Sequence, residues 1–349
     1  MIPVFVLTGF LGAGKTTLLN RLLRDPALSD TLVIVNEFGD VGLDHLLVER
    51  FDGEIALLAS GCLCCALRGD LVEALSNILT RRALGDIAPF ARIIIETSGL
   101  ADPAPVLHAL LSDPLLTDEL EAPFVVTIVD AVNGIASLDA HPECRRQIAV
   151  ADRLVVSKGD MLPSGQRDAA LSDLTWRLRE LNPNAPISEA DSAELTARRL
   201  FSGAAAERAP PSRFFADDGA SSHRGAIRSD VLRWPTPVDR ASLALFLDLV
   251  LAAHGPKLLR VKGLVALADN PDSPLVLHGA QHAVHTPARL SAWPDDDHTT
   301  RIVFITEGLE PSTIQRFWSA LVGEGAIDAP DRAALLDNPL VVRAGGLLS

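Results

Sequence analysis

The stretch Gly9-Phe10-Leu11-Gly12-Ala13-Gly14-Lys15-Thr16 decides the fold of this chain, because it matches the phosphate-loop pattern G-x-x-x-x-G-K-[ST] at every fixed position. The apolar run Ile2–Leu7 precedes it and the helix-forming run Thr17–Arg24 follows it. Glycines let backbone N–H groups wrap around phosphates, and the N-terminus of the following helix adds positive partial charge. A chance glycine turn would lack this order of strand, lysine, threonine and helix, so the segment predicts a nucleotide-binding P-loop.

The residues of this loop have separate expected roles. Those expected to bind the nucleotide are Gly9, Gly12, Ala13, Gly14, Lys15, Thr16 and Thr17. Lys15 should also act in catalysis by reaching the β- and γ-phosphates, and Thr16 should be a ligand of Mg²⁺.

Outward from the loop, the first half of the chain alternates strand-like and helix-like runs. The strand-like runs are Ile2–Leu7, Thr31–Val35, Arg92–Ile95, Phe124–Val129, Arg153–Val156 and the short Ala185–Ile187. Amphipathic segments such as Asp70–Arg82 lie between some of them. Continuous apolar strands separated by helices predict an α/β fold, a P-loop NTPase with a mostly parallel sheet that is covered on both faces.

The second half of the chain changes character after a segment rich in Ala, Ser, Pro, Gly, Arg and Asp. Expected strands are Val231–Trp234, Leu258–Leu267, Pro274–His285 and Arg301–Thr306, and expected helices are Arg240–Ala253 and Pro311–Val322. These runs predict a smaller α+β domain with a mostly antiparallel sheet. The expected division is a P-loop domain at residues 1–200, a flexible linker at 201–229, the α+β domain at 230–330 and a tail at 331–349.

The segment Glu96-Thr97-Ser98-Gly99 follows the expected strand Arg92–Ile95 and has the layout of a Walker B residue and switch II. Glutamate takes the place of the commoner aspartate. We expect Glu96 to lie near the Mg²⁺ ion and its waters, and the Gly99 amide to sense the γ-phosphate, so both are candidate catalytic residues. The alternative is an ordinary turn at the end of a strand.

The segment Ser157-Lys158-Gly159-Asp160 follows the expected strand Arg153–Val156 and predicts the choice of base. In guanine-specific proteins the motif is Asn-Lys-x-Asp, whose aspartate accepts hydrogen bonds from N1–H and the exocyclic amine, which adenine cannot offer. Lys158 and Asp160 match this motif, whereas Ser157 replaces asparagine and loses some amide hydrogen bonding. The segment predicts GTP rather than ATP.

A cysteine cluster lies in Gly61-Cys62-Leu63-Cys64-Cys65, between the expected second and third strands. Thiols with an open or exchangeable further position fit a carrier site from which a metal ion must leave, and thiolates select Zn²⁺ or Cu(I), with Co²⁺ tolerated. We therefore predict Cys62, Cys64 and Cys65 as metal ligands; the alternative is buried thiols in a packed turn. Cys144 stands alone and is expected to be an ordinary buried thiol.

Glu37 lies in the segment Asn36–Asp40, after the second expected strand, where switch I of P-loop GTPases is found. It could ligate Mg²⁺ or approach the thiolate-bound metal. Because this segment and the cysteine motif are close in sequence, the γ-phosphate could bias the metal site.

Composition argues against several other classes of function. The net charge of -14, from 31 basic and 45 acidic residues, disfavours nucleic acid as a main partner, because phosphate binding needs a basic surface. No run approaches the roughly 18 continuous apolar residues of a membrane span, and the N-terminus lacks the basic start of a signal peptide. We therefore expect no membrane partner and a cytoplasmic location.

Taken together, these motifs closely resemble those of the CobW-type metallochaperone GTPases, relatives of the urease and hydrogenase nickel-insertion GTPases. The segments that carry the resemblance are Gly9–Thr17, Asn36–Gly39, Gly61–Cys65, Glu96–Pro103, Val129–Ala131, Ser157–Asp160, Leu259–Leu264, Ala292–Pro294 and Arg301–Phe304. The resemblance implies a cytosolic enzyme that uses GTP and Mg²⁺, hydrolyses GTP to GDP and phosphate, and delivers Zn²⁺ or Co²⁺ to a client metalloprotein. In the cobalamin branch the cargo is cobalt, and a further branch resembles activators of nitrile hydratase.

The chain departs from many members of this family in lacking a histidine-rich stretch near the linker, where only His223 stands. A second group, His278, His282 and His285, falls in an expected strand, where His278 and His282 would share one face. We expect surface or hydrogen-bonded histidines there rather than a second metal site.

The motifs predict that GTP–Mg²⁺ orders the switches and gathers the cysteines into a tight metal site, which hydrolysis on a client then opens. Intrinsic hydrolysis should be slow, since the motifs contain no arginine finger or glutamine. Two other classes remain open: a P-loop small-molecule kinase, which needs neither Ser157–Asp160 nor the cysteines, and a metal-responsive regulatory GTPase that never delivers metal. The sequence defines neither the physiological metal, the client nor the oligomeric state.

Overall fold

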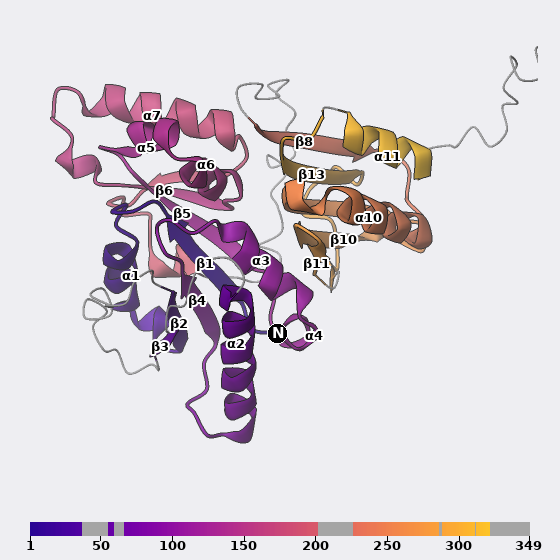
Figure 1. The fold of residues 1–349 in the computed structure, drawn as a ribbon, viewed down its shortest axis with the longest axis horizontal. Coiled ribbons are helices and arrows are strands. Elements are labelled where there is room, and N and C mark those ends of the chain that lie inside the picture. The colour runs from indigo at the N-terminus through magenta and orange to yellow at the C-terminus, as the bar shows by residue number, and fades with distance from the viewer. Residues whose placement is uncertain (37–54, 59–65, 202–225, 286–287, 311, 322–349) are drawn as a thin grey trace, which may run out of the picture.

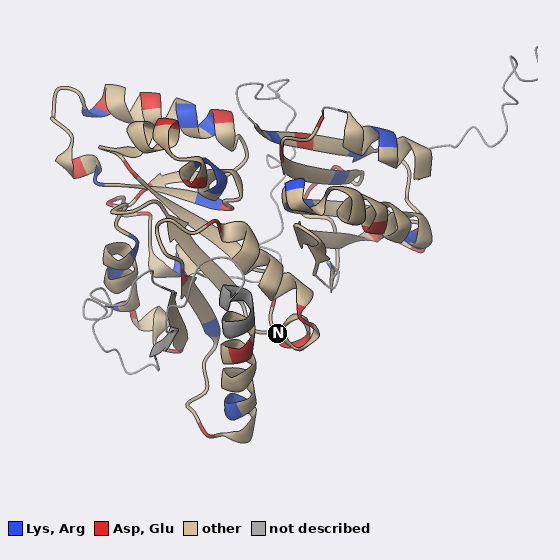
Figure 2. Ribbon diagram, in the orientation of Figure 1, with Lys and Arg blue, Asp and Glu red and all other residues tan. Residues whose placement is uncertain are grey.

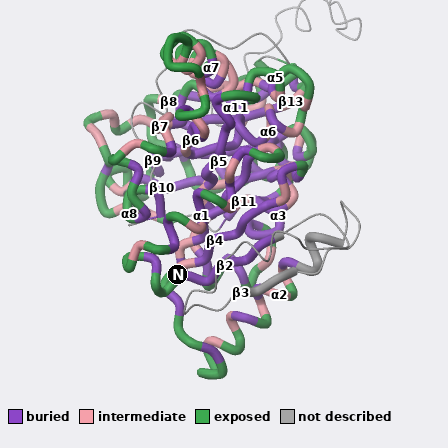
Figure 3. The backbone as a smooth tube through the Cα atoms, turned by 90° about the vertical axis from the view of Figure 1, so that its left-hand side faces the viewer, coloured by how far each residue is buried: buried purple, intermediate pink, exposed green. Residues whose placement is uncertain are grey.

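The structure is a computed structural model that describes residues 1–36, 55–58, 66–201, 226–285, 288–310 and 312–321. A parallel sheet forms the N-terminal part and an antiparallel sheet forms the C-terminal domain, with helices packed against both (Figure 1). Acidic and basic residues are interspersed along α7 (Arg167–Leu181; Figure 2), and the buried residues are concentrated on the strands (Figure 3). No helix in the described part of the chain is long and apolar enough to cross a membrane.

The N-terminal part alternates strands and helices. Its strands are β1 (Val4–Gly9), β2 (Thr31–Asn36), β3 (Ile55–Leu58), β4 (Arg92–Glu96), β5 (Phe124–Asp130), β6 (Arg153–Ser157) and β7 (Ile187–Glu189). Its helices are α1 (Lys15–Leu23), α2 (Ala66–Leu84), α3 (Pro103–Ser112), α4 (Pro114–Glu119), α5 (Gly134–Ala140), α6 (Pro142–Ala149), α7 (Arg167–Leu181) and α8 (Ala197–Phe201). The strand order β3-β2-β4-β1-β5-β6-β7, with parallel pairing throughout, confirms the predicted P-loop α/β fold.

The strands are apolar along their length because helices cover both faces of the sheet. Every residue of β1 is buried. Leu19 of α1 and Phe201 of α8 pack on one face, whereas Leu75 of α2 and Leu107 of α3 pack on the other. In open α/β sheets ligands bind outside the carboxyl ends of the strands. The loops that follow β1, β4 and β6 all leave from this edge.

One strand of the sheet was not expected from the sequence. β3 pairs with β2 in parallel, with Asn36 opposite Leu58. Its sequence, Ile-Ala-Leu-Leu, contains a single β-branched residue, and alanine and leucine favour helices, so local propensity does not mark it as a strand. The cysteine motif thus lies in the sequence between β3 and α2, still between the second and third strands that were expected.

The C-terminal domain is an antiparallel sheet with helices packed against it, in which the last strand lies between the first two. Its strands are β8 (Ile227–Trp234), β9 (Leu258–Leu267), β10 (Asn270–Ala280), β11 (Ala283–Val284), β12 (Ala288–Arg289) and β13 (Thr300–Glu307), and its longer helices are α10 (Arg240–His254) and α11 (Thr313–Leu321). The order is β11-β10-β9-β13-β8, with β12 paired to β10, which confirms the predicted α+β class. β8 begins inside the segment 201–229 that was expected to be a linker; residues 202–225 and the tail lie outside the described residues.

The expected strand Pro274–His285 is broken by a tight turn. Gln281 adopts a left-handed conformation, with φ of 52°, and the chain reverses there from β10 into β11. The expectation that His278 and His282 share a strand face is therefore wrong. His282 Nδ1 lies 3.0 Å from the Leu251 carbonyl oxygen, so this ring holds the turn against α10.

The two sheets share a buried apolar interface. One cluster joins Val4 and Leu107 of the N-terminal part to Leu259, Val276 and Val303 of the C-terminal domain. α3 lies between the sheets, next to β10 and β11 (Figure 1). Burial of apolar surface therefore holds the C-terminal domain against the helix that follows β4.

Charged side chains are also buried at this interface. Asp152, immediately before β6, accepts a hydrogen bond from Arg260 at 3.2 Å and contacts Lys262; both partners come from β9. Asp152 also accepts a hydrogen bond from the Val125 amide at 2.8 Å. The three charged side chains are between 2% and 4% exposed, so each depends on the others for compensation.

Burial alone would raise the pKa of the Asp152 carboxyl group. The charges of Lys262 and Arg260 outweigh burial and hold the pKa of Asp152 below its ordinary value. A carboxyl group with a lowered folded-state pKa stabilises the protein above its unfolded pKa of about 4, and that contribution is lost as pH falls through the folded-state pKa.

We predict that Asp152→Asn lowers the free energy of unfolding by about 3 kcal/mol at pH 7, because it leaves two buried cations without their anion. The measurement is equilibrium urea unfolding between pH 7 and pH 3, and the deficit should shrink in acid. Asp191→Asn is the matched control: Asp191 pairs with Arg21 at the surface and is 56% exposed. Its effect should stay within about 0.5 kcal/mol. Equal effects of the two variants would contradict the role given to Asp152.

Candidate nucleotide-binding site

The loop Gly9–Thr16 connects β1 to α1 and lies against the end of β5. A Cβ atom built on Gly9 would lie 2.3 Å from the Ile128 carbonyl oxygen, and φ of Gly9 is 145°, so only glycine fits where the loop leaves the sheet. Of the other predicted nucleotide-binding residues, Ala13 is buried, Gly14 caps α1, and Gly12 and Thr17 are exposed. The loop thus presents its backbone at the carboxyl edge of the sheet.

Lys15 is the first residue of α1 and its side chain folds back into the loop. Its Nζ donates hydrogen bonds to the carbonyl oxygens of Gly9 at 2.9 Å and Phe10 at 3.3 Å. The residue is only 9% exposed. The ammonium group is therefore held at the centre of the loop by weak, neutral acceptors.

Thr16, in the first turn of α1, meets Glu96 at the end of β4. Thr16 Oγ1 donates a hydrogen bond of 2.6 Å to Glu96 Oε1. Glu96 ends β4 and pairs with Leu7 of β1, and it is 4% exposed. A hydroxyl and a carboxylate oxygen in contact match the oxygen ligands that Mg²⁺ prefers, so the residues present fit the ion that the motif implies.

Gly99 packs directly on the P-loop. A Cβ atom on Gly99 would lie 2.7 Å from the Leu11 backbone nitrogen and 2.8 Å from its Cα, so no side chain can be accommodated. Two residues earlier, Thr97 Oγ1 donates to Thr8 Oγ1 at 2.8 Å. The segment Glu96–Asp102, called the switch segment below, is thereby fitted to β1 and to its loop.

Ser157 connects the loop after β6 to the P-loop. Its Oγ donates to the Ala13 carbonyl oxygen at 2.6 Å and lies 3.2 Å from the Val129 carbonyl oxygen. Serine at this position therefore binds the phosphate loop with its hydroxyl group, although it lacks the amide of asparagine.

Lys158 and Asp160 lie on either side of a sharp turn. Lys158 has φ of 59°, and its Nζ is 2.7 Å from Asp130 Oδ2. Asp160 is exposed. Burial would raise the pKa of Asp130, but the hydrogen bonds from Lys158 and Asn133 outweigh it and lower the pKa. Asp130 thus stays anionic and holds the Lys158 side chain in place.

Two residues around the site were not singled out as site residues from the sequence. Asp130, which ends β5, orients Lys158. Gln147 of α6 is fully buried and donates to the carbonyl oxygens of Gly99 and Ala101. Asp130 stands directly after an apolar strand, a signal that could have marked it, whereas no local pattern marks Gln147.

Apart from Thr16, the predicted metal ligands lie outside the part of the chain that the structure describes. They are Glu37, Cys62, Cys64 and Cys65. Cys144 is 4% exposed, and burial raises the pKa of its thiol to about 11, so it is the ordinary buried thiol that was expected. Within the residues that are described, no group of His, Cys, Asp and Glu is arranged to hold a metal ion.

Comparison with known proteins gives two family matches. Residues 3–189 match the CobW/HypB/UreG nucleotide-binding domain, and residues 227–322 match the C-terminal domain of the cobalamin synthesis protein CobW. The matches together cover both sheets, so they extend beyond the nucleotide site.

Individual relatives align along most of the chain. The zinc chaperone YjiA of Escherichia coli is 30% identical over 327 residues, covering 92% of this chain and 98% of that protein. The zinc chaperone CobW of Pseudomonas aeruginosa is 31% identical over 349 residues, covering 90% of this chain and 89% of that protein. The solved Zn(II)-bound YjiA GTPase of E. coli has a TM-score of 0.63 and 27% identity, over 92% of this chain and 98% of that one.

We predict that Gly99→Ala weakens binding of a non-hydrolysable GTP analogue by about tenfold or more, because a methyl group pressed on the Leu11 backbone must displace the P-loop or the switch segment. The measurement is fluorescence titration with a labelled analogue. Gly165→Ala is the control, since a Cβ atom there meets nothing within 4 Å. Unchanged affinity in Gly99→Ala would show that this contact does not shape the site.

Proposed function

Because the chain belongs to the CobW/HypB/UreG family of P-loop GTPases, we propose that it is a GTP-hydrolysing metallochaperone that binds Zn²⁺ through Cys62, Cys64 and Cys65 and delivers it to a client metalloprotein. The observation that carries the proposal is the contact of Thr16 with Glu96 beside the buried ammonium of Lys15. These groups supply a hydroxyl, a carboxylate and a cation at one point, which is what the phosphates of GTP and their cation require.

At the phosphate end, the proposed role of Lys15 is to exchange its loop carbonyls for the β- and γ-phosphate oxygens. A charged phosphate oxygen forms a stronger hydrogen bond with an ammonium group than a backbone carbonyl oxygen does, which favours the exchange. Thr16 and Glu96 would hold Mg²⁺, which when bound neutralises charge on the same phosphates. The proposed role of the Gly99 amide is to sense whether a γ-phosphate is present, and the close packing of Gly99 on Leu11 supports it.

At the base end, Asp160 is the proposed acceptor for guanine N1–H and its exocyclic amine. Lys158, held by Asp130, would lie beside the base and ribose. Ser157 would act through the P-loop, since its hydroxyl group binds Ala13. Removal of the Ser157 hydroxyl group would then weaken phosphate binding as well as base binding, because its hydrogen bond to Ala13 joins the loop after β6 to the P-loop.

The sheet topology supports a link between the nucleotide and the metal. β2 ends at Asn36 and β3 at Leu58, and the two residues are paired, so both strands end at the same edge of the sheet as β1. The chain continues from these ends toward Glu37 and toward the cysteines. That both segments start from the edge that carries the P-loop favours the proposal that switch I and the thiolates respond to the γ-phosphate.

Zinc is the proposed cargo because two relatives that align along most of the chain are named zinc chaperones. Three thiolates also suit a borderline ion such as Zn²⁺, which tolerates the loss of a ligand during transfer. Release would accompany hydrolysis, when the switches lose the γ-phosphate that orders them.

We predict that Glu96→Gln lowers kcat/KM for GTP hydrolysis by about 100-fold, because it keeps an acceptor for Thr16 but removes the negative charge that the cation needs. The assay measures phosphate released from GTP without any added acceptor, which also separates a GTPase from a small-molecule kinase. Glu194→Gln serves as the control, because Glu194 is 77% exposed and pairs with Arg199. Hydrolysis by Glu96→Gln at the wild-type rate would contradict the proposed site.

A further inference from the structure

Helix α6 contacts the switch segment through a fully buried side chain. Gln147 Nε2 donates to the carbonyl oxygens of Gly99 at 3.1 Å and Ala101 at 3.0 Å. Two carbonyl acceptors fix which end of the amide carries the nitrogen. Gly99 is therefore held from both sides, by Leu11 of the P-loop and by Gln147.

The helix that carries Gln147 is itself anchored. Thr127 Oγ1, on β5, donates to the Gln147 carbonyl oxygen at 2.7 Å. Asn182, at the end of α7, donates through Nδ2 to the carbonyl oxygens of Ile148 and Ala149 at 2.9 and 3.1 Å. These bonds fix α6 to β5 and to the end of α7. The position of α6 is therefore set independently of the switch segment.

The preceding residue, Arg146, connects the same segment to the C-terminal domain. Its Nη1 lies 3.1 Å from Asp102 Oδ2, and its Nε lies 2.8 Å from Glu307 Oε2. Asp102 also accepts a hydrogen bond from the Ala104 amide at 2.9 Å, so it starts α3. Glu307 ends β13. One guanidinium group thus joins the end of the switch segment to the antiparallel sheet.

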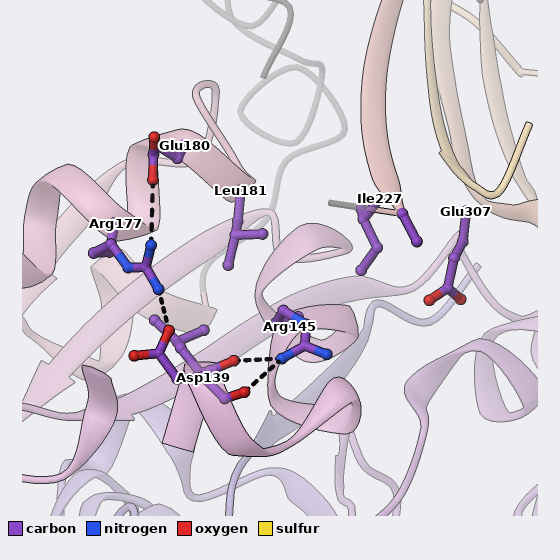
Figure 4. A pocket seen from close by; sticks show the side chains of 9 residues that line it. Asp139, Arg145, Arg177, Glu180, Leu181, Ile227 and Glu307 are labelled. Carbon is purple, nitrogen blue, oxygen red and sulfur yellow. Dashed lines mark hydrogen bonds and ion pairs between the residues drawn. The ribbon is translucent and has the colours of Figure 1, made fainter. Parts of the chain in front are cut away.

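Glu307, at the C-terminal end of this bridge, also lines a cavity at the domain junction. This cavity of about 300 Å³ opens between α5, α6 and α7 on one side and the start of β8 on the other. Figure 4 shows Arg145 and Ile227 facing each other across it, with Glu307 at its wall. At this part of the junction the charged bridge lies beside Ile227, which is buried and belongs to the apolar cluster that joins the two sheets.

We propose that Gln147 is a positioning residue that holds the Gly99 amide in place for the γ-phosphate. Arg146, through its ion pair with Glu307, makes the position of this amide depend on the position of the C-terminal domain. The inference rests on the proposed GTPase function. Gln147 acts through the switch segment and does not touch the nucleotide. It should therefore affect GTP, which carries the γ-phosphate, more than GDP, which lacks it.

The first test replaces Gln147 by methionine, which has similar length but no donor. Dissociation constants for the Mg²⁺ complexes of GTPγS and GDP are measured by fluorescence titration, with circular dichroism as the check on folding. The expected result is an approximately tenfold weaker binding of GTPγS with GDP affinity changed less than about twofold. Equal weakening of both nucleotides, or of neither, would overturn the positioning role.

Gln147→Asn provides a second variant if methionine prevents folding. Asparagine keeps an amide on a shorter side chain that cannot reach both carbonyl groups, so it should give the same selective loss in smaller degree. A wild-type protein that binds neither nucleotide would refute the proposed function itself, which separates that failure from a failure of this inference.

The second test addresses the link to the C-terminal domain. Glu307→Gln keeps the size of the side chain but removes the charge that faces Arg146, while Asp102 remains. The ratio of GDP to GTPγS dissociation constants should change by about two- to threefold, since the pair is partly exposed. Glu310→Gln, an exposed glutamate that follows β13, is the control and should leave the ratio unchanged. Identical ratios in the two variants would overturn the coupling.

Discussion

Parallel pairing of β1 with β4 and with β5 places three strand ends at one edge of the sheet, and the described nucleotide site depends on that edge. β1 supplies the P-loop, β4 supplies Glu96, and β5 supplies Asp130. Because the loops meet backbone to backbone, glycine is required where they touch, at Gly9 and Gly99. The position of the phosphate-binding loops thus follows from the register of the strands and not from particular side chains.

The second organising feature is the junction between the sheets. An apolar cluster and the buried group of Asp152, Arg260 and Lys262 fix the C-terminal domain against α3 and β6. At the other end of the same junction the contact is a partly exposed ion bridge beside a cavity. Buried apolar side chains, a buried charged group and a partly exposed ion pair therefore join the two parts, and the ion pair is the contact that reaches the switch segment directly.

The sequence predicted those parts of the fold that depend on fixed spacing or continuous patterns. The P-loop, its flanking strand and helix, and the apolar strands β4 to β6 carry their signals within a few residues. β3 was missed because its residues favour a helix, and the β10–β11 turn was missed because nothing at Gln281 marks a reversal. Gln147 lies 48 residues from Gly99, so their contact depends on packing that no local pattern records.

The central claim is that nucleotide state controls a thiolate-bound metal ion. It is tested most directly by the Zn²⁺ affinity of the whole chain, measured by competition with a calibrated chelator in the GTPγS–Mg²⁺ and the GDP–Mg²⁺ states. The account predicts tighter binding with GTPγS by about tenfold or more, since the γ-phosphate must bias the metal site by at least about 1.4 kcal/mol to act as a gate. Equal Zn²⁺ affinity in the two states would contradict it.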